Sequence, residues 1–159
     1  MDVLLVVDMQ EGLLRGAAKY DLVGVVARIN HLASRVRRAG GRVFFVQHAG
    51  PAGDDFEPLT PGWRLLSTIN TEPSDRIVNK TLNDPFFGTS LESDLTKLGT
   101  ERLLVPGWAT DLCVDATIRS AAALDFTVVA VADCHTVSDR PHLIAPHPVR
   151  IAREGEVQQ

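Results

Sequence analysis

VLLVV at residues 3–7 is the first of five short apolar runs, and the others read RVFFV at 42–46, RIV at 76–78, RLLVP at 102–106 and FTVVAVA at 126–132. These runs are continuous rather than alternating and are rich in Val, which is typical of strands buried on both faces of a parallel sheet. Between them, helices are expected at residues 22–39, 89–98 and 111–124. Alternating strands and helices predict an open α/β sheet with right-handed crossovers.

The composition is that of an ordinary globular chain. Its 159 residues predict one domain spanning residues 1–159, and 45% of them are hydrophobic. The net charge of −4 argues against a nucleic-acid binder, which usually carries a basic stripe. Two cysteines do not make a disulfide scaffold, and the sequence has neither a signal peptide nor a membrane-length apolar stretch. We therefore expect a cytoplasmic protein without a membrane partner.

Two stretches concentrate Gly, Pro or Asp and are expected to be loops, residues 49–62 and residues 138–149. Such loops often carry binding groups, although they serve equally as plain connections. The tail from Arg150 onward is expected to be weakly ordered.

Three polar residues stand where an apolar run stops, and they are the candidate catalytic groups: Asp8, Lys80 and Cys113. Open α/β sheets bind ligands at the carboxyl ends of their strands, so these side chains are expected to meet there. Each residue also has an ordinary explanation. An Asp at a strand end caps helices or is solvated, a Lys is usually a surface residue, and a free Cys is usually a small buried apolar residue.

The surroundings of Cys113 favour chemistry over packing. Thr110 is a good N-cap, which would place Cys113 at the third position of a helix. There the helix macrodipole and the ammonium of Lys80 are expected to lower the thiol pKa and favour the nucleophilic thiolate. Asp8 would accept the thiol proton and return it to the leaving group. The backbone N–H groups of Ala109 and Cys113 would face the developing oxyanion.

In these motifs the sequence resembles the isochorismatase-like hydrolases. Residues 8–10 (DMQ) match the D-x-Q that follows the family's first strand, and residues 80–89 (KTLNDPFFGT) match its K-x5-F-x-G-T segment. Residues 107–117 (GWATDLCVDAT) resemble the nucleophile motif, and residues 133–136 (DCHT) resemble the segment after the next strand. The resemblance covers most of the chain, and the motifs are specific in this combination and order.

The resemblance implies a three-layer α/β/α, Rossmann-like fold with a mainly parallel sheet of about six strands. It implies a catalytic triad of Asp8, Lys80 and Cys113, and a non-proline cis peptide between Trp108 and Ala109. It also implies hydrolysis of amides, of carbamoyl compounds or of the isochorismate vinyl ether. Assembly into a homo-oligomer, a dimer or a tetramer, is a further implication.

The sequence departs from the metal-dependent nicotinamidases of this family. They carry an Asp-x-His after the second strand, whereas here Val46 stands at the position of the Asp and is followed by Gln47 and His48. No second His follows within residues 49–62. We therefore expect no metal and no other cofactor, and His48 is interpreted as a polar strand-end residue or a hydrogen-bonding partner of the substrate.

Four further residues are candidates for contacts with a small-molecule substrate: Gln10, Gln47, Phe86 and Trp108. Trp108 is bulkier than the Val common at its position, so it would either wall a flat substrate or pack in the core. Residues 146–148 (PHP) interrupt a segment that is usually helical in the family. A last strand or helix is therefore expected to be shortened, or completed by another subunit.

The sequence leaves three functions open. The first is hydrolysis of a C–N bond in a small amide, imide or carbamoyl compound through a thioester on Cys113. The second is a catalytically silent binding or scaffold protein that keeps the site without turnover. The third, a redox sensor that pairs Cys113 with Cys134, has the least support because Cys134 is interpreted as a structural residue.

Overall fold

The computed structural model describes residues 1–141. They form a five-stranded parallel sheet in the order β3-β2-β1-β4-β5. The strands are β1 (Asp2–Val7), β2 (Arg42–His48), β3 (Arg76–Lys80), β4 (Arg102–Trp108) and β5 (Thr127–Thr136). All five apolar runs of the sequence are thus strands. The described residues hold five of the about six strands expected, and the predictions for residues 142–159 lie outside them.

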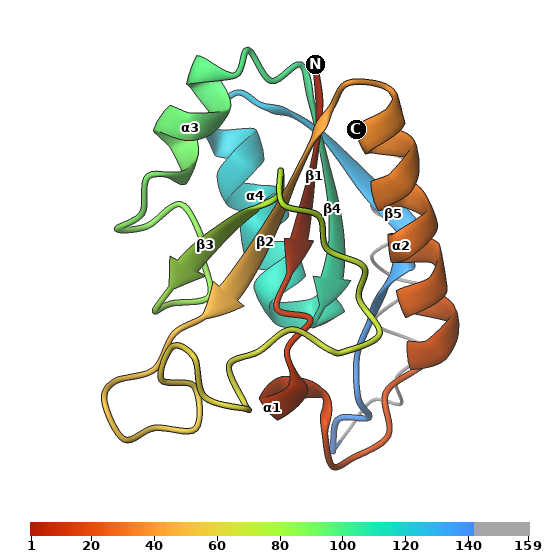
Figure 1. Cartoon of the computed structure of the whole chain (residues 1–159), viewed down its shortest axis with the longest axis vertical. Coiled ribbons are helices and arrows are strands. Elements are labelled where there is room, and N and C mark those ends of the chain that lie inside the picture. The colour runs from red at the N-terminus through yellow and green to blue at the C-terminus, as the bar shows by residue number, and fades with distance from the viewer. Residues whose placement is uncertain (142–159) are drawn as a thin grey trace.

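Helices cover both faces of the sheet (Figure 1). They are α1 (Glu11–Leu14), α2 (Leu22–Arg38), α3 (Leu91–Lys97) and α4 (Asp115–Ala123), with a π-helical turn, η1 (Thr110–Val114), directly before α4. α2 lies on one face, whereas α3 and α4 lie on the other, which confirms the three-layer α/β/α fold. No helix within residues 1–141 is long and apolar enough to cross a bilayer.

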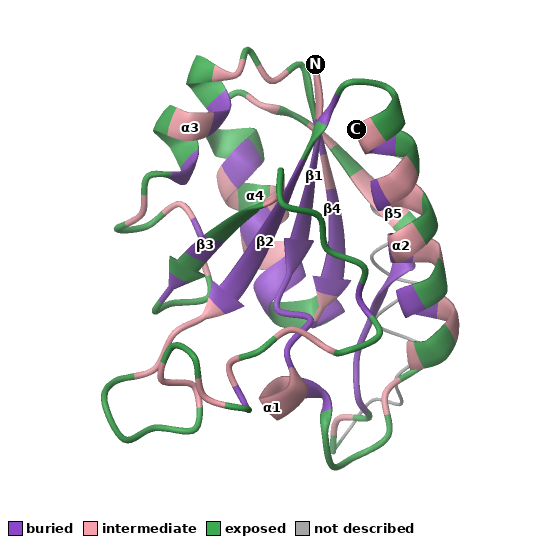
Figure 2. Ribbon diagram, viewed as in Figure 1, coloured by how far each residue is buried: buried purple, intermediate pink, exposed green. Residues whose placement is uncertain are grey.

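The sheet is buried on both faces, and this explains why its strands read as continuous apolar runs. Val3, Leu5 and Val7 of β1 pack with α3 and α4, whereas Leu4 and Val6 pack with α2. Figure 2 shows the three central strands, β2, β1 and β4, as almost entirely buried, with more exposure on the two edge strands. The carboxyl ends of the central strands are therefore closely packed, and residues that follow them are held in fixed positions.

Gly107 lets the two innermost strands approach each other. It lies inside β4 with φ +134°, a conformation that side chains of L-residues rarely adopt, and a Cβ there would come within 2.1 Å of the Val7 carbonyl oxygen. Glycine is therefore required at this point of the β1–β4 contact. The end of β1 and the segment that carries Cys113 are consequently fixed next to each other.

The segment between β2 and β3 is tied to α2 by an ion pair. Arg37 donates hydrogen bonds from Nη2 and Nε to Asp75, at 2.6 and 3.0 Å. The two side chains are only 11% and 5% exposed. Because charges in such a place are poorly solvated, this pair is a specific anchor for the chain just before β3.

Candidate active site

Three groups that lie far apart in the sequence meet at the carboxyl edge of the sheet. Asp8 directly follows β1, Lys80 is the last residue of β3, and Cys113 lies in η1, shortly after β4. Lys80 Nζ lies 2.8 Å from Asp8 Oδ2 and 3.5 Å from Cys113 Sγ. Asp8 and Lys80 are each 1% exposed, and Cys113 is 8% exposed. The structure therefore brings these three sequence candidates into one buried cluster.

Lys80 has a partner for each of its three N–H bonds. Besides the carboxylate and the sulfur, it donates a hydrogen bond of 3.0 Å to the backbone oxygen of Leu82. A buried ammonium with three acceptors is fully satisfied, which is the condition for keeping a charge away from water. The lysine thus connects the carboxylate, the thiol and the loop that follows β3.

Asp8 is held in an unusual backbone conformation at the end of β1. Its φ of 52° lies in the left-handed region, and its N–H donates to the Val46 oxygen at 2.9 Å. Within residues 1–141, Oδ1 has no hydrogen bond of normal geometry. Burial raises the pKa of Asp8, although the Lys80 ammonium and the Cys113 thiol oppose this shift. The carboxylate is therefore a stronger base than a solvated Asp, and it lies close to the thiol.

Cys113 does not have the acidic thiol that the sequence suggested. Burial and the negative charge of Asp8 raise its pKa to about 12, and these effects outweigh the opposing charge of Lys80. The prediction of a lowered pKa is therefore wrong for the protein without substrate. At neutral pH the resting sulfur is a thiol, and its proton has to be removed for it to become a nucleophile.

The turn that carries Cys113 also differs in detail from the prediction. The peptide bond between Trp108 and Ala109 is cis, as the resemblance implied. Thr110, however, does not cap the helix, because its hydroxyl group bonds to His135 Nδ1 at 2.9 Å and to the backbone oxygen of Thr136 at 3.1 Å. The first turn is π-helical and has no side-chain cap. Thr110 therefore fastens the nucleophile turn to β5.

Asn83 is a contact of the thiol that the sequence analysis missed. Cys113 Sγ donates to Asn83 Oδ1 at 3.6 Å, and Asn83 itself is exposed. The residue lies in the K-x5-F segment, but an Asn in a loop gives no signal of its own in a single sequence. The only feature of the sequence that pointed to a role for Asn83 was its position three residues after Lys80.

Both polar atoms of the Gln10 side chain form hydrogen bonds with the backbone. Its Nε2 donates to the backbone oxygens of His48 and Trp63, at 3.0 and 2.8 Å, and its Oε1 accepts from the His48 N–H at 2.7 Å. These bonds join the end of β1 to the end of β2 and to the loop beyond. The geometry favours a positioning role for Gln10, and its contact with a substrate stays a prediction.

Phe86 and Trp108 both pack against the core. Phe86 lies beside the α3/α4-side cluster and stacks on Phe126 with ring centroids 6.1 Å apart. Trp108 packs against the α2-side cluster and has Lys19 Nζ 5.1 Å from its ring centroid. Their predicted contacts with a substrate remain predictions.

The region of the nicotinamidase metal site has a different character here. Val46 is fully buried in the core, and the His48 ring makes an edge contact with Phe56 at a centroid distance of 5.6 Å. Within residues 1–141, no group of three or more His, Cys, Asp or Glu side chains is arranged to hold a metal ion.

Cys113 and Cys134 lie on opposite sides of the sheet. Cys113 belongs to the core cluster under α3 and α4, whereas Cys134 belongs to the cluster under α2. Neither is in a disulfide. The layer of strands between them argues against the redox-sensor hypothesis, because a disulfide needs Cα atoms within about 7 Å of each other.

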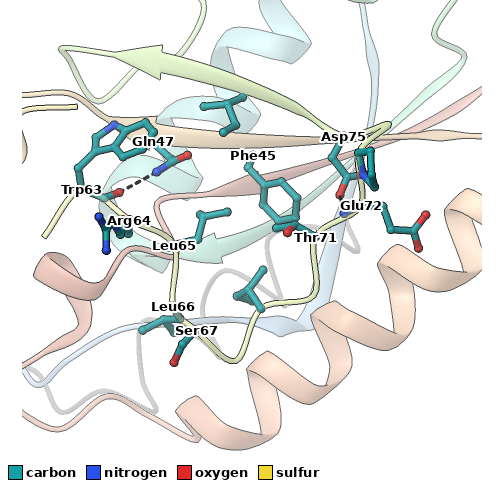
Figure 3. A pocket seen from close by; sticks show the side chains of 13 residues that line it. Phe45, Gln47, Trp63, Arg64, Leu65, Leu66, Ser67, Thr71, Glu72 and Asp75 are labelled. Atoms are coloured by element: carbon teal, nitrogen blue, oxygen red, sulfur yellow. Dashed lines mark hydrogen bonds between the residues drawn. The ribbon is translucent and has the colours of Figure 1, made fainter. Parts of the chain in front are cut away.

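A cavity of about 570 Å³ lies beside β2 and β3, apart from the three clustered groups. Its walls include Phe45, Gln47, Trp63, Leu65, Ile69 and Ile77 (Figure 3). Gln47 Nε2 donates to the Trp63 oxygen at 2.7 Å, whereas Gln47 Oε1 is buried without a hydrogen-bond partner among residues 1–141. Gln47 thus borders a cavity that none of the three clustered groups lines, and its predicted contact with the substrate stays a prediction.

The family model and the similar proteins point to the same family. The Isochorismatase domain matches residues 2–144. A streptothricin hydrolase from Streptomyces noursei is 37% identical over 142 residues, which cover 89% of this chain and 51% of the relative. A ureidoacrylate amidohydrolase from Stutzerimonas stutzeri is 27% identical, with 82% of this chain and 67% of the relative covered.

A solved structure of an isochorismatase family protein superposes with a TM-score of 0.90 at 27% identity, covering 96% of this chain and 91% of the other. The chain spans about half the length of the streptothricin hydrolases that it matches. The family model agrees with the parallel fold and with the cluster of Asp8, Lys80 and Cys113. The chain belongs to the isochorismatase-like hydrolase family.

Proposed function

We propose that this protein hydrolyses a C–N bond of a small amide, imide or carbamoyl compound through a thioester on Cys113. The observation that carries the proposal is the position of the Lys80 ammonium, 2.8 Å from the Asp8 carboxylate and 3.5 Å from the Cys113 sulfur. An acid/base group, a nucleophile and a fixed positive charge in contact are the parts that acyl transfer to a thiol needs.

In the first step the thiol proton moves to Asp8, and the sulfur attacks the substrate carbonyl carbon. The raised pKa of Asp8 suits this transfer, because a more basic carboxylate takes a proton more readily. Lys80 stays protonated and stabilises the negative charge that passes from Asp8 to the sulfur. The N–H groups of Ala109 and Cys113 are the proposed donors to the tetrahedral oxyanion, and losing one such donor costs about 2.7–4 kcal/mol.

In the second step the C–N bond breaks, and the leaving nitrogen takes the proton from Asp8. The acyl group remains on the sulfur as a thioester. Water then attacks the thioester and gives one proton to Asp8. When the C–S bond breaks, the acid product leaves and this proton returns to the sulfur, which restores the thiol and the carboxylate.

The relatives support an amide-like substrate. Two of them carry the names streptothricin hydrolase and ureidoacrylate amidohydrolase. This chain spans about half of the former, so the two names support the kind of bond that is cleaved and not the acyl and amine parts of the substrate.

The test is a screen of small amides, ureido compounds and cyclic imides for release of ammonia or amine, followed by variants on an accepted compound. Cys113→Ala should abolish turnover, because no other group in the cluster can form the thioester. Cys134→Ala, on the other side of the sheet, is the matched control and should keep the wild-type rate. Unchanged hydrolysis by Cys113→Ala would refute the thioester mechanism.

A second candidate function is a silent binding protein, and the resting thiol favours it. Cys113 is 8% exposed, and its pKa is raised to about 12. A compound that binds saturably, protects Cys113 from alkylation and is never hydrolysed would support this candidate. Measurable turnover that depends on Cys113 would exclude it.

A further inference from the structure

We propose that Asn83 holds the thiol proton of Cys113 away from Asp8 until an N–H group of the substrate takes the Asn83 oxygen. Asn83 is then a positioning residue that couples activation of the nucleophile to substrate binding. The inference deepens the proposed function and rests on it. It also restricts the substrate to compounds with an N–H donor next to the scissile carbonyl, such as primary amides, ureido compounds and N–H imides.

The sulfur has two neighbours with opposite roles. It accepts a hydrogen bond from Lys80 Nζ at 3.5 Å, and it donates its own proton to Asn83 Oδ1 at 3.6 Å. The proton of a thiol can point to only one acceptor at a time. The structure places Asn83 Oδ1 at 3.6 Å from the sulfur, whereas Asp8 Oδ1 has no hydrogen bond of normal geometry among the described residues, although the Asp8 carboxylate is close enough to raise the thiol pKa. Asn83 and Asp8 therefore compete for this proton.

Asn83 is the solvent-exposed neighbour of the sulfur. Cys113 is 8% exposed, whereas Asn83 is exposed to solvent. The Asp8–Lys80 pair lies on the buried side, with both side chains 1% exposed. A substrate that approaches from solvent consequently meets the amide of Asn83 together with the thiol.

The backbone around Asn83 is fixed on both sides. The Leu82 oxygen accepts from Lys80 Nζ at 3.0 Å, and Asp84 Oδ1 accepts from the Phe86 N–H at 2.9 Å. Within the described chain, the contact with Cys113 is the single hydrogen bond of the Asn83 side chain. The side chain can therefore exchange its partner without rearrangement of the loop.

The exchange is favourable because a thiol is a weak hydrogen-bond donor. An amide or ureido N–H bonds a carbonyl oxygen more strongly than an S–H does. Once a substrate N–H occupies Asn83 Oδ1, the S–H turns to Asp8, the remaining acceptor. The proton then moves from sulfur to the carboxylate, no other bond changes, and the thiolate is favoured when substrate is in place.

The test separates thiol reactivity from turnover. In the protein without substrate, Cys113 is labelled with methyl methanethiosulfonate, which has no N–H, and the rate is followed by mass spectrometry of its peptide. Asn83→Ala removes the acceptor that stabilises the neutral thiol, so labelling should become faster by about threefold to tenfold, the effect of one neutral hydrogen bond. Hydrolysis of an accepted amide should become slower by a similar factor.

Three comparisons make the result specific. Benzyl methanethiosulfonate should show the same acceleration, whereas a factor that grows with reagent size would mean that Asn83→Ala only opens space. Asn83→Asp keeps an acceptor and adds a negative charge, so its labelling should be slower than that of the wild type. Thr81→Ala, an exposed neighbour, is the control and should change neither rate.

Faster labelling by the same factor with both reagents, together with slower hydrolysis, supports the proposal in Asn83→Ala, because a loosened loop would accelerate the two reagents unequally. Slower or unchanged labelling would overturn it. If no amide is hydrolysed by the wild type, the proposed function fails. The labelling rates still decide whether Asn83 restrains the thiol proton.

Discussion

Removing the Lys80 ammonium is expected to destabilise the fold in a way that depends on pH. Lys80 and Asp8 are each 1% exposed and 2.8 Å apart. The variant Lys80→Met keeps a side chain of similar length and leaves the Asp8 carboxylate buried without its partner. Breaking a buried pair in this way costs about 3–5 kcal/mol near neutral pH. For a chain of this size the melting temperature should fall by roughly 6–20 °C.

The direction of the pH dependence follows from Asp8. Without the lysine, burial raises the folded-state pKa of Asp8 further above its unfolded value of about 3.9. Between these two pKa values the folded state binds a proton that the unfolded state has released. The stability of Lys80→Met should therefore decrease as pH rises through this window, by up to about 1.4 kcal/mol per pH unit. Toward pH 4 the deficit relative to the wild type should become small.

The assay is urea unfolding followed by circular dichroism at several pH values from 4.5 to 8. Asp8→Asn combined with Lys80→Met removes both charges, so its deficit should stay flat with pH. Arg102→Met is the exposed comparison, because the Arg102–Asp2 side chains are 58% and 27% exposed and such pairs contribute about 0–1 kcal/mol. A Lys80→Met deficit that is below 1 kcal/mol, or that does not vary between pH 5 and 8, would refute the reasoning.

Two further predictions concern the scaffold of the site. Gly107→Ala should prevent stable folding or lower the melting temperature strongly, because its Cβ would lie 2.1 Å from the Val7 oxygen at φ +134°. Expression yield and thermal unfolding measure this effect. Asp75→Ala should cost about 1.5–3 kcal/mol in urea unfolding, because the Arg37 guanidinium, 11% exposed, loses its two hydrogen bonds to the buried carboxylate and keeps the Glu72 carboxylate, 3.5 Å away and 55% exposed.

Gly107→Ala and Asp75→Ala each have a matched control variant. Gly53 has a positive φ of 83° but no neighbour within 4 Å of an added Cβ, so Gly53→Ala isolates the backbone cost, about 1 kcal/mol. Asp2→Ala breaks an exposed pair and should change the unfolding free energy by less than about 1 kcal/mol. If either control is as damaging as its counterpart, close packing or burial is not the cause.

The sequence was sufficient to predict the architecture because the apolar runs carry the signal of burial. Each run became a strand, and residues 22–39 became α2 to within one residue. Asp8, Lys80 and Cys113 could be chosen because polar groups at the ends of parallel strands meet at one edge of the sheet. Their convergence follows from topology, which the alternation of strands and helices reveals.

The electrostatics of the site could not be predicted in the same way. The macrodipole and the Lys80 charge suggested an acidic thiol, but the depth of burial decides the pKa of Cys113, and burial depends on packing by distant segments. Thr110 looked like a cap, yet its hydroxyl bonds to β5. Asn83 was missed because its role depends on a contact across 30 positions of the chain.

The order of the strands gives the Asp8–Lys80 pair a mechanical consequence. β1 and β3 are not neighbours, because β2 lies between them, and among the strands of residues 1–141 β3 is the outermost on its side of the sheet. The ion pair thus passes across the end of β2 and links the edge strand β3 to the central strand β1. If β3 detaches from β2, Lys80 moves away from Asp8 and Cys113. Local unfolding of this edge strand would therefore also inactivate the site.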